Sequence, residues 1–112
     1  MVVDDDTAVL RTTVRLLDSL DFETLAASSG TEALQLLGTG VKIDVVLTDL
    51  AMPEMSGVEL TRIIRVDNPA LPVILVTGYR SPELLSEFGD DKILQKPFAD
   101  EQLFKKITSV LT

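Results

Sequence analysis

Short apolar runs alternate along this chain with longer segments whose apolar residues recur at the spacing of one helix face, and this alternation constrains the fold most strongly. We predict strands at residues 2–3, 22–27, 43–48, 72–76 and 93–95. We predict helices at residues 7–20, 31–37, 58–66, 82–88 and 100–111. Strands that alternate with helices form right-handed βαβ units, which build a parallel sheet with helices on both faces. The expected fold class is therefore α/β, with a doubly wound, five-stranded parallel sheet and five helices.

Local signals support several of these elements. The run at residues 43–48 is rich in β-branched residues and almost continuously apolar, as expected of a strand buried on both faces. Residues 50–57 contain a proline and end in glycine, which favours a loop. Ser81 followed by Pro82 is typical of an N-cap and of the first position of a helix.

The composition restricts the chemistry that is available. The chain contains no Cys and no His, which excludes disulfides, thiolate or imidazole metal ligands and Ser–His–Asp catalysis. Its formal net charge of −8 argues against direct contact with nucleic acid or an anionic membrane. There is no signal-peptide pattern and no long apolar segment, so we expect residues 1–112 to form one soluble, intracellular domain. Any chemistry must come from carboxylates, hydroxyls, lysines or backbone amides.

Polar residues follow four of the predicted strands. Three aspartates at residues 4–6 follow the first strand, and Asp49, Thr77 and Lys96 follow the third, fourth and fifth. Because parallel strands bring their carboxyl ends to one edge, these groups should converge there. Carboxylates without His or Cys suit Mg²⁺, and a metal, a lysine and a hydroxyl together suit a phosphoryl group in transfer. Asp49 would then be the covalent acceptor.

Four segments at these strand ends resemble the receiver (response-regulator) domain of two-component signalling. They are Val-Val-Asp-Asp-Asp at 2–6, Val-Val-Leu-Thr-Asp-Leu-Ala-Met-Pro-Glu-Met-Ser-Gly at 45–57, Pro-Val-Ile-Leu-Val-Thr-Gly at 72–78 and Leu-Gln-Lys-Pro-Phe at 94–98. The second is the most specific, because its Asp, Met-Pro and Gly recur at the spacing of the family. The resemblance covers essentially the whole chain and implies a flavodoxin-like sheet with the strand order 2-1-3-4-5.

The resemblance also implies roles for the acidic residues. Asp49 resembles the phospho-accepting nucleophile. Asp5, Asp49 and the backbone carbonyl of Ala51 resemble the Mg²⁺ ligands, and Asp4 resembles an acid that acts on the metal through water. A domain of this kind catalyses its own phosphorylation and dephosphorylation and is not a free-standing enzyme.

Two further residues resemble the parts of the family that respond to phosphorylation. Thr77 resembles the switch hydroxyl that turns towards the phosphate, and Lys96 resembles the cationic partner of the phosphate, with a cis peptide to Pro97. Ile93 departs from the pattern, because many receivers carry an aromatic residue there that rotates with the switch threonine. The stretch from Thr77 to Lys96 is also about one helical turn short, so we expect a short fourth helix.

The partners follow from the same resemblance. A receiver takes its phosphoryl group from a sensor histidine kinase or a histidine phosphotransfer domain. A stand-alone receiver is one alternative, but the Leu-Gln-Lys-Pro-Phe and Thr-Gly-Tyr segments look most like receivers attached to hybrid sensor kinases, so we expect a hybrid-kinase origin. That origin implies a cytoplasmic location, tethered where the kinase is bound to a membrane, with no direct contact with the membrane or with nucleic acid.

Two other functions compete with this interpretation. The pattern Asp4-x-Asp6 partly matches the first motif of haloacid-dehalogenase-type phosphatases, which would make Asp4 the nucleophile, although Asp90 and Asp91 precede Lys96 instead of following it. A flavodoxin-like FMN module would need a phosphate-binding loop after the first strand, where three aspartates repel phosphate. Taken alone, such an acidic run is more typical of a helix cap. The co-occurrence of polar residues at four strand ends favours the receiver.

Overall fold

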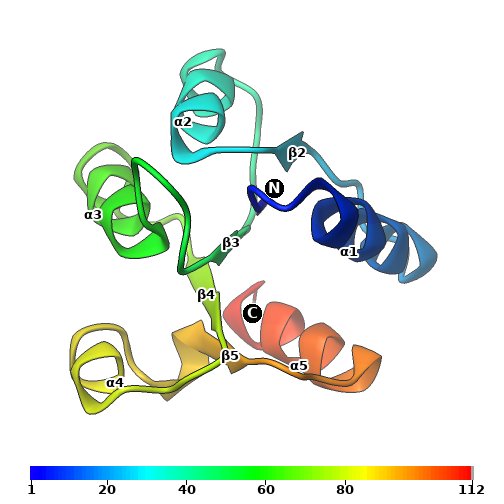
Figure 1. Cartoon of the computed structure of the whole chain (residues 1–112). Coiled ribbons are helices and arrows are strands. Elements are labelled where there is room, and N and C mark those ends of the chain that lie inside the picture. Colours follow the sequence, from blue (N-terminus) through cyan, green and yellow to red (C-terminus); the bar gives the residue numbers. More distant parts are fainter. Residues whose placement is uncertain (112) are drawn as a thin grey trace.

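The computed structural model describes residues 1–111 and shows one parallel sheet of five strands in the order β2-β1-β3-β4-β5 (Figure 1). The strands are β1 (Val2–Val3), β2 (Ala26–Ala27), β3 (Val46–Asp49), β4 (Val73–Thr77) and β5 (Ile93–Gln95). The helices are α1 (Thr7–Ser19), α2 (Gly30–Gly38), α3 (Gly57–Asp67), α4 (Pro82–Phe88) and α5 (Asp100–Leu111), with a 3₁₀ turn η1 (Asp90–Lys92). The flavodoxin-like α/β fold is confirmed, and η1 is an element that the sequence had not predicted.

Helices cover both faces of the sheet. In Figure 1, α1 and α5 lie on one side of the sheet and α2, α3 and α4 on the other. Neighbouring strand residues point to opposite faces, so that Val2 packs with α1 and α5 while Val3 packs with α2 and α3. Because both faces of the sheet are buried, the strands are continuous apolar runs in which polar and apolar residues do not alternate. Within residues 1–111, none of the helices is both long and apolar enough to cross a bilayer.

Three strands differ in their boundaries from the sequence prediction. The second strand is limited to Ala26–Ala27, because it lies at the edge of the sheet and pairs only with Val2–Val3 of β1. The third strand begins at Val46 and includes Asp49, since its pairing with β4 continues to the Asp49↔Val76 pair. Asp49 therefore lies within the paired part of β3 and not in the loop that follows it. The fourth strand is Val73–Thr77 and not residues 72–76, so Thr77 is its last residue, paired with Gln95 of β5, and does not follow it.

The fourth helix is short, as predicted. α4 has seven residues and begins at an N-cap, Ser81, whose hydroxyl accepts a hydrogen bond from the Leu84 amide at 3.2 Å. It ends at Gly89, whose φ of 85° favours glycine. The chain then forms η1 before it enters β5.

Gly57 lets α3 begin directly against the end of β3. The sequence placed this residue in a loop, but it is the first residue of α3, after the N-cap Ser56. Its amide donates to the Leu50 carbonyl oxygen at 2.8 Å. A Cβ atom at this position would meet the Asp49 carbonyl oxygen and would lie 3.0 Å from Leu50 Cα. Both neighbours are backbone atoms, which cannot move aside to make room for a Cβ atom as the end of a flexible side chain can.

Gly57→Ala is therefore expected to lower the free energy of unfolding by about 1–3 kcal/mol, the usual cost of overpacking a closely packed site. Urea unfolding followed by circular dichroism measures this difference. Gly38→Ala is the matched control, because a Cβ there meets nothing within 4 Å and alanine favours a helix. A Gly57→Ala protein as stable as the wild type would contradict the close approach of α3 to β3.

Candidate functional site

Three aspartates form a cluster at the carboxyl ends of β1 and β3. The carboxylates of Asp4, Asp5 and Asp49 each offer an oxygen atom, and these atoms lie within 4.8 Å of one another. The pairing of Val3 with Thr48 brings the two strand ends together, although they are far apart in the sequence. Asp4 is buried, Asp49 is partly buried and Asp5 is exposed, so the cluster opens to solvent on one side.

The third aspartate of the run, Asp6, has a different role. It is the N-cap of α1, and its carboxylate accepts hydrogen bonds from the Ala8 amide at 3.0 Å and the Val9 amide at 3.2 Å. The interpretation of the acidic run as a helix cap therefore holds for Asp6, whereas Asp4 and Asp5 contribute to the cluster.

The surroundings of Asp4 favour its protonated form. Burial raises the pKa of Asp4, and the negative charges of Asp49 and Asp5 raise it further. The Asp6 amide, which donates to Asp4 Oδ1 at 2.9 Å, and the positive charge of Lys96 act in the opposite direction. A pKa that is raised overall means that the cluster holds negative charge at a cost when no cation is present.

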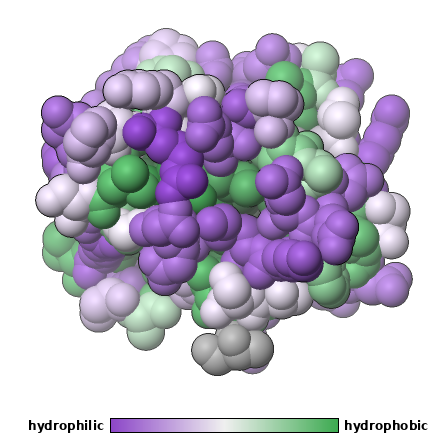
Figure 2. Space-filling model, turned by 90° about the horizontal axis from the view of Figure 1, so that it is seen from below, coloured by the Kyte–Doolittle hydropathy of each residue, from purple (hydrophilic) through white to green (hydrophobic). Residues whose placement is uncertain are grey.

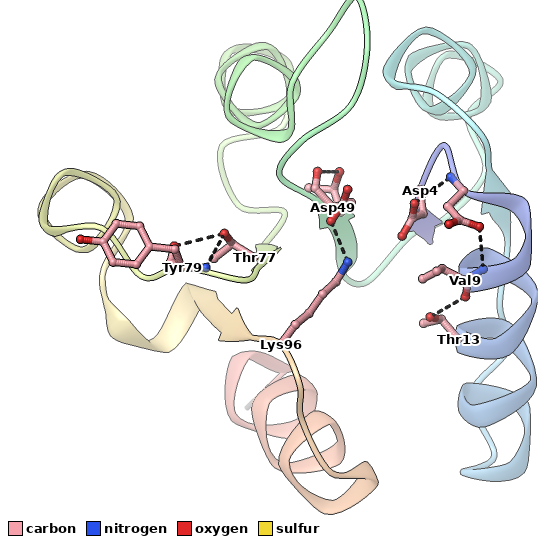
Figure 3. Close-up of polar contacts among 9 residues, drawn as sticks. Asp4, Val9, Thr13, Asp49, Thr77, Tyr79 and Lys96 are labelled. Atoms are coloured by element: carbon pink, nitrogen blue, oxygen red, sulfur yellow. Dashed lines mark hydrogen bonds and ion pairs between the residues drawn. The ribbon is translucent and has the colours of Figure 1, made fainter.

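Lys96 is the residue directly after β5, and its side chain reaches the acidic cluster at the ends of β1 and β3. Its Nζ donates to Asp49 Oδ1 at 3.1 Å (Figure 3). The Asp49 side chain is only 15% exposed, so the ion pair is partly shielded from water. The peptide between Lys96 and Pro97 is cis, as the family resemblance implied. The sequence prediction that a carboxylate and an ammonium group meet here is confirmed by this contact.

Thr77 reaches the same edge of the sheet but does not contact Asp49. Its hydroxyl donates to the Tyr79 carbonyl oxygen at 3.1 Å and accepts from the Tyr79 amide at 3.2 Å. Figure 3 shows the hydroxyl directed towards the backbone of Tyr79 and away from Lys96 and Asp49. In this arrangement the hydroxyl is satisfied within its own turn.

Two further positions complete the set named from the sequence. Ala51 lies two residues beyond Asp49, in the loop that leads to α3, and it is exposed. The role of its carbonyl group as a metal ligand stays a prediction. Ile93 is 1% exposed in β5, so an apolar side chain fills the space at this position.

Sequence reasoning missed the contacts that hold the turn after β4. The Gln95 side-chain amide donates to the Gly78 carbonyl oxygen at 3.4 Å. Arg80 forms an ion pair with Asp90, which lies at the start of η1. No local pattern indicated these contacts, because each joins residues from different elements.

The donors of the cluster fit a hard divalent cation. Carboxylate oxygens are the ligands that Mg²⁺ prefers, and Mg²⁺ binds through a few carboxylates while it keeps several waters. The partial exposure of the cluster leaves room for such waters and for a ligand. Together with Lys96, the site can hold an anion such as a phosphoryl group next to the Asp49 carboxylate.

Comparison with known proteins agrees with this geometry. Residues 1–108 match the family model described as the response regulator receiver domain. The sensor kinase CckA of Brucella abortus is 34% identical over 115 residues, which cover 99% of this chain and 12% of the relative. A transcriptional regulatory protein of Haemophilus influenzae, described as a CpxR homolog, is 34% identical over 113 residues, which cover 99% and 49%. The chain thus spans less than half the length of these relatives.

Solved structures show the same likeness. A response regulator receiver domain protein from Clostridium thermocellum superposes with a TM-score of 0.89 at 33% identity, covering 98% of this chain and 90% of that one. The receiver domain of the hybrid histidine kinase CckA superposes with a TM-score of 0.82 at 28% identity, covering 99% and 96%. These matches favour the receiver interpretation over the phosphatase and the FMN module.

Proposed function

Because the chain belongs to the response regulator receiver domain family of two-component signalling, we propose that it accepts a phosphoryl group on Asp49 from a phosphohistidine donor and changes conformation in response. The observation that carries this proposal is the contact of Lys96 Nζ with Asp49 Oδ1, at 3.1 Å, beside two further aspartates. A carboxylate that is held by an ammonium group at an open acidic site is well placed to act as a nucleophile towards phosphorus.

The transfer forms one bond and breaks one. An oxygen of the Asp49 carboxylate attacks the phosphorus atom, and the imidazole of the donor leaves with the electron pair of the P–N bond. The product is an acyl phosphate on Asp49. Lys96 then neutralises a phosphoryl oxygen, and the Thr77 hydroxyl turns from Tyr79 to donate to another.

The acidic residues would serve the same reaction by holding Mg²⁺. Asp5, Asp49 and the carbonyl of Ala51 would be ligands, with Asp4 acting through water. When bound, Mg²⁺ supplies positive charge that offsets the negative charge of the phosphoryl oxygens. The close approach of the three carboxylates supports this assignment, because each oxygen lies within 4.8 Å of the others.

We further propose a sensor histidine kinase or a histidine phosphotransfer domain as the donor. The likeness to the sensor kinase CckA and to the receiver of its hybrid kinase supports a donor of this kind. The proposed location is cytoplasmic, with tethering where the parent kinase is bound to a membrane.

The test is to incubate the protein with Mg²⁺ and a small acyl phosphate and to map the modified residue by mass spectrometry. The expected result is one phosphoryl group per chain, on the peptide that contains Asp49. A label on Asp4 would instead support the phosphatase mechanism. Failure to label in the presence of Mg²⁺ would contradict the proposed function.

Mg²⁺ is expected to stabilise the protein against heat. A cation that binds only the folded state at about ten times its Kd adds roughly 1.4 kcal/mol to the free energy of unfolding. For a domain of this size, the melting temperature should rise by about 4–8 °C per kcal/mol. Melting curves in EDTA and in Mg²⁺ measure the difference, and equal melting temperatures would mean that these carboxylates do not form a metal site.

Two additional measurements locate this effect in the cluster. Asp5→Asn should stabilise the metal-free protein and weaken its response to Mg²⁺, whereas Glu23→Gln, an equal change of charge at an exposed position between α1 and β2, should do neither.

The raised pKa of Asp4 means that the folded state binds more protons than the unfolded state. The stability in EDTA should therefore fall as the pH rises above 3.8, the ordinary value, and through the folded-state pKa.

A further inference from the structure

A polar groove runs along the face formed by η1, β5 and α5. Figure 2 views the molecule from this side and shows hydrophilic side chains over much of the surface. The groove has a volume of about 610 Å³, and its lining includes Arg80, Asp90, Gln95 and Lys106. Two of its cations share one partner residue: Arg80 pairs with the Asp90 carboxylate, and Lys106 donates to the Asp90 carbonyl oxygen at 3.0 Å. Asp90 therefore links η1 to Arg80 and to α5 at this groove.

These contacts hold the turn that contains Thr77. The Gln95 side chain donates to the carbonyl oxygen of Gly78, and Arg80 binds Asp90. Ile93 is buried and apolar, so it offers the turn no hydrogen bond. Residues 77–80 thus make polar contacts on the groove side through Gly78 and Arg80, while the Thr77 hydroxyl is bound to the Tyr79 backbone.

We propose that Arg80 and Asp90 are a positioning pair that holds Thr77 away from Asp49 and so restrains the response to phosphorylation. The inference rests on the proposed function of Asp49. For the Thr77 hydroxyl to reach a group on Asp49, both of its hydrogen bonds to Tyr79 must break and the turn must move. Arg80 is the last residue of this turn and directly precedes the N-cap Ser81, so it moves with the turn and leaves Asp90.

The far end of α4 contacts α3, at the opposite end of the helix from the turn. Arg62 of α3 forms two hydrogen bonds to the Glu87 carboxylate, at 2.8 and 3.0 Å. The guanidinium group of Arg65 lies 4.8 Å from the ring centroid of Phe88. These contacts join the last residues of α4 to α3 and do not involve the turn that contains Thr77.

Breaking the pair should favour the responsive arrangement by linkage. A contact that exists only in the resting arrangement lowers the population able to bind a phosphoryl group, and its removal raises the apparent affinity. Beryllofluoride, a mimic of the phosphoryl group, is the probe, titrated at saturating Mg²⁺ and followed by amide NMR shifts. Arg80→Gln should bind it about two- to five-fold more tightly than the wild type, the range that a partly exposed ion pair supplies.

Several measurements separate positioning from a general structural role. Asp90→Asn should give the same gain, and the double variant Arg80→Gln/Asp90→Asn should gain no more than either single variant. Arg80→Lys, which keeps the charge, should behave like the wild type. The gain should shrink at about 0.5 M NaCl, because the pair is open to solvent. The Mg²⁺ affinity measured without beryllofluoride should not change, since Arg80 does not belong to the acidic cluster.

Arg15→Gln is the matched control, because it removes the same charge from an exposed site on α1. The proposal is overturned if Arg80→Gln and Asp90→Asn bind beryllofluoride no more tightly than the wild type, or if Arg15→Gln shows an equal gain. Additive gains in the double variant would also overturn it. If the wild type itself does not bind beryllofluoride in Mg²⁺, the proposed function of Asp49 fails instead.

Discussion

Asp49→Asn is expected to abolish the incorporation of phosphate from a small acyl phosphate, with a loss of at least about 100-fold. The amide oxygen of Asn is a poor nucleophile and cannot form a stable acyl phosphate. The substitution keeps the shape of the side chain in β3, so the fold should persist. Phosphate incorporation in Mg²⁺, measured by intact-protein mass, gives the result directly.

The control for this variant is Asp44→Asn. Asp44 precedes β3 at the opposite end of the strand, where it is exposed, so the same change of charge occurs away from the acidic cluster. This variant should label like the wild type. Full labelling of Asp49→Asn would mean that another residue accepts the phosphoryl group, and a label on Asp4 would restore the phosphatase interpretation.

Lys96→Ala is expected to remove most of the conformational response while some phosphorylation remains. Lys96 contacts Asp49 Oδ1 in the structure, and in the proposed mechanism its ammonium group pairs with a phosphoryl oxygen after transfer. Loss of a hydrogen bond between charged groups costs about 1.5–3 kcal/mol, or roughly 10- to 150-fold in the ratio of responsive to resting protein. Amide NMR spectra of the phosphorylated variant should therefore resemble those of the unphosphorylated protein.

Lys105→Ala provides the comparison for this result. Lys105 is exposed on α5 and pairs with Glu101 at 3.3 Å, so its loss removes the same charge without touching Asp49. It should respond to phosphorylation as the wild type does. A phosphorylated Lys96→Ala protein that shows the complete wild-type shift changes would contradict the role of Lys96.

Periodicity and turn residues were sufficient to predict the order of strands and helices. The β-branched run before Asp49 and the Ser81-Pro82 start of α4 are local signals, and both elements are present in the structure. Their boundaries were less accurate, because a strand ends where its neighbour ends: β2 extends only as far as its two-residue pairing with β1. The position of Gly57 inside α3 depended on contact with the backbone of β3, which no local pattern reveals.

By itself, the sequence determined which polar groups lie at the carboxyl ends of which strands, and the rule that parallel strands share one edge then brought Asp4, Asp49 and Lys96 together. Only the tertiary structure decided how these groups are used. It separated Asp6, which caps α1, from Asp4 and Asp5, and it turned the Thr77 hydroxyl towards Tyr79. The physical reason is the range of the interactions. Helix periodicity and caps involve residues a few positions apart, whereas the Lys96–Asp49 contact joins residues 47 positions apart, and its geometry exists only once the sheet has formed.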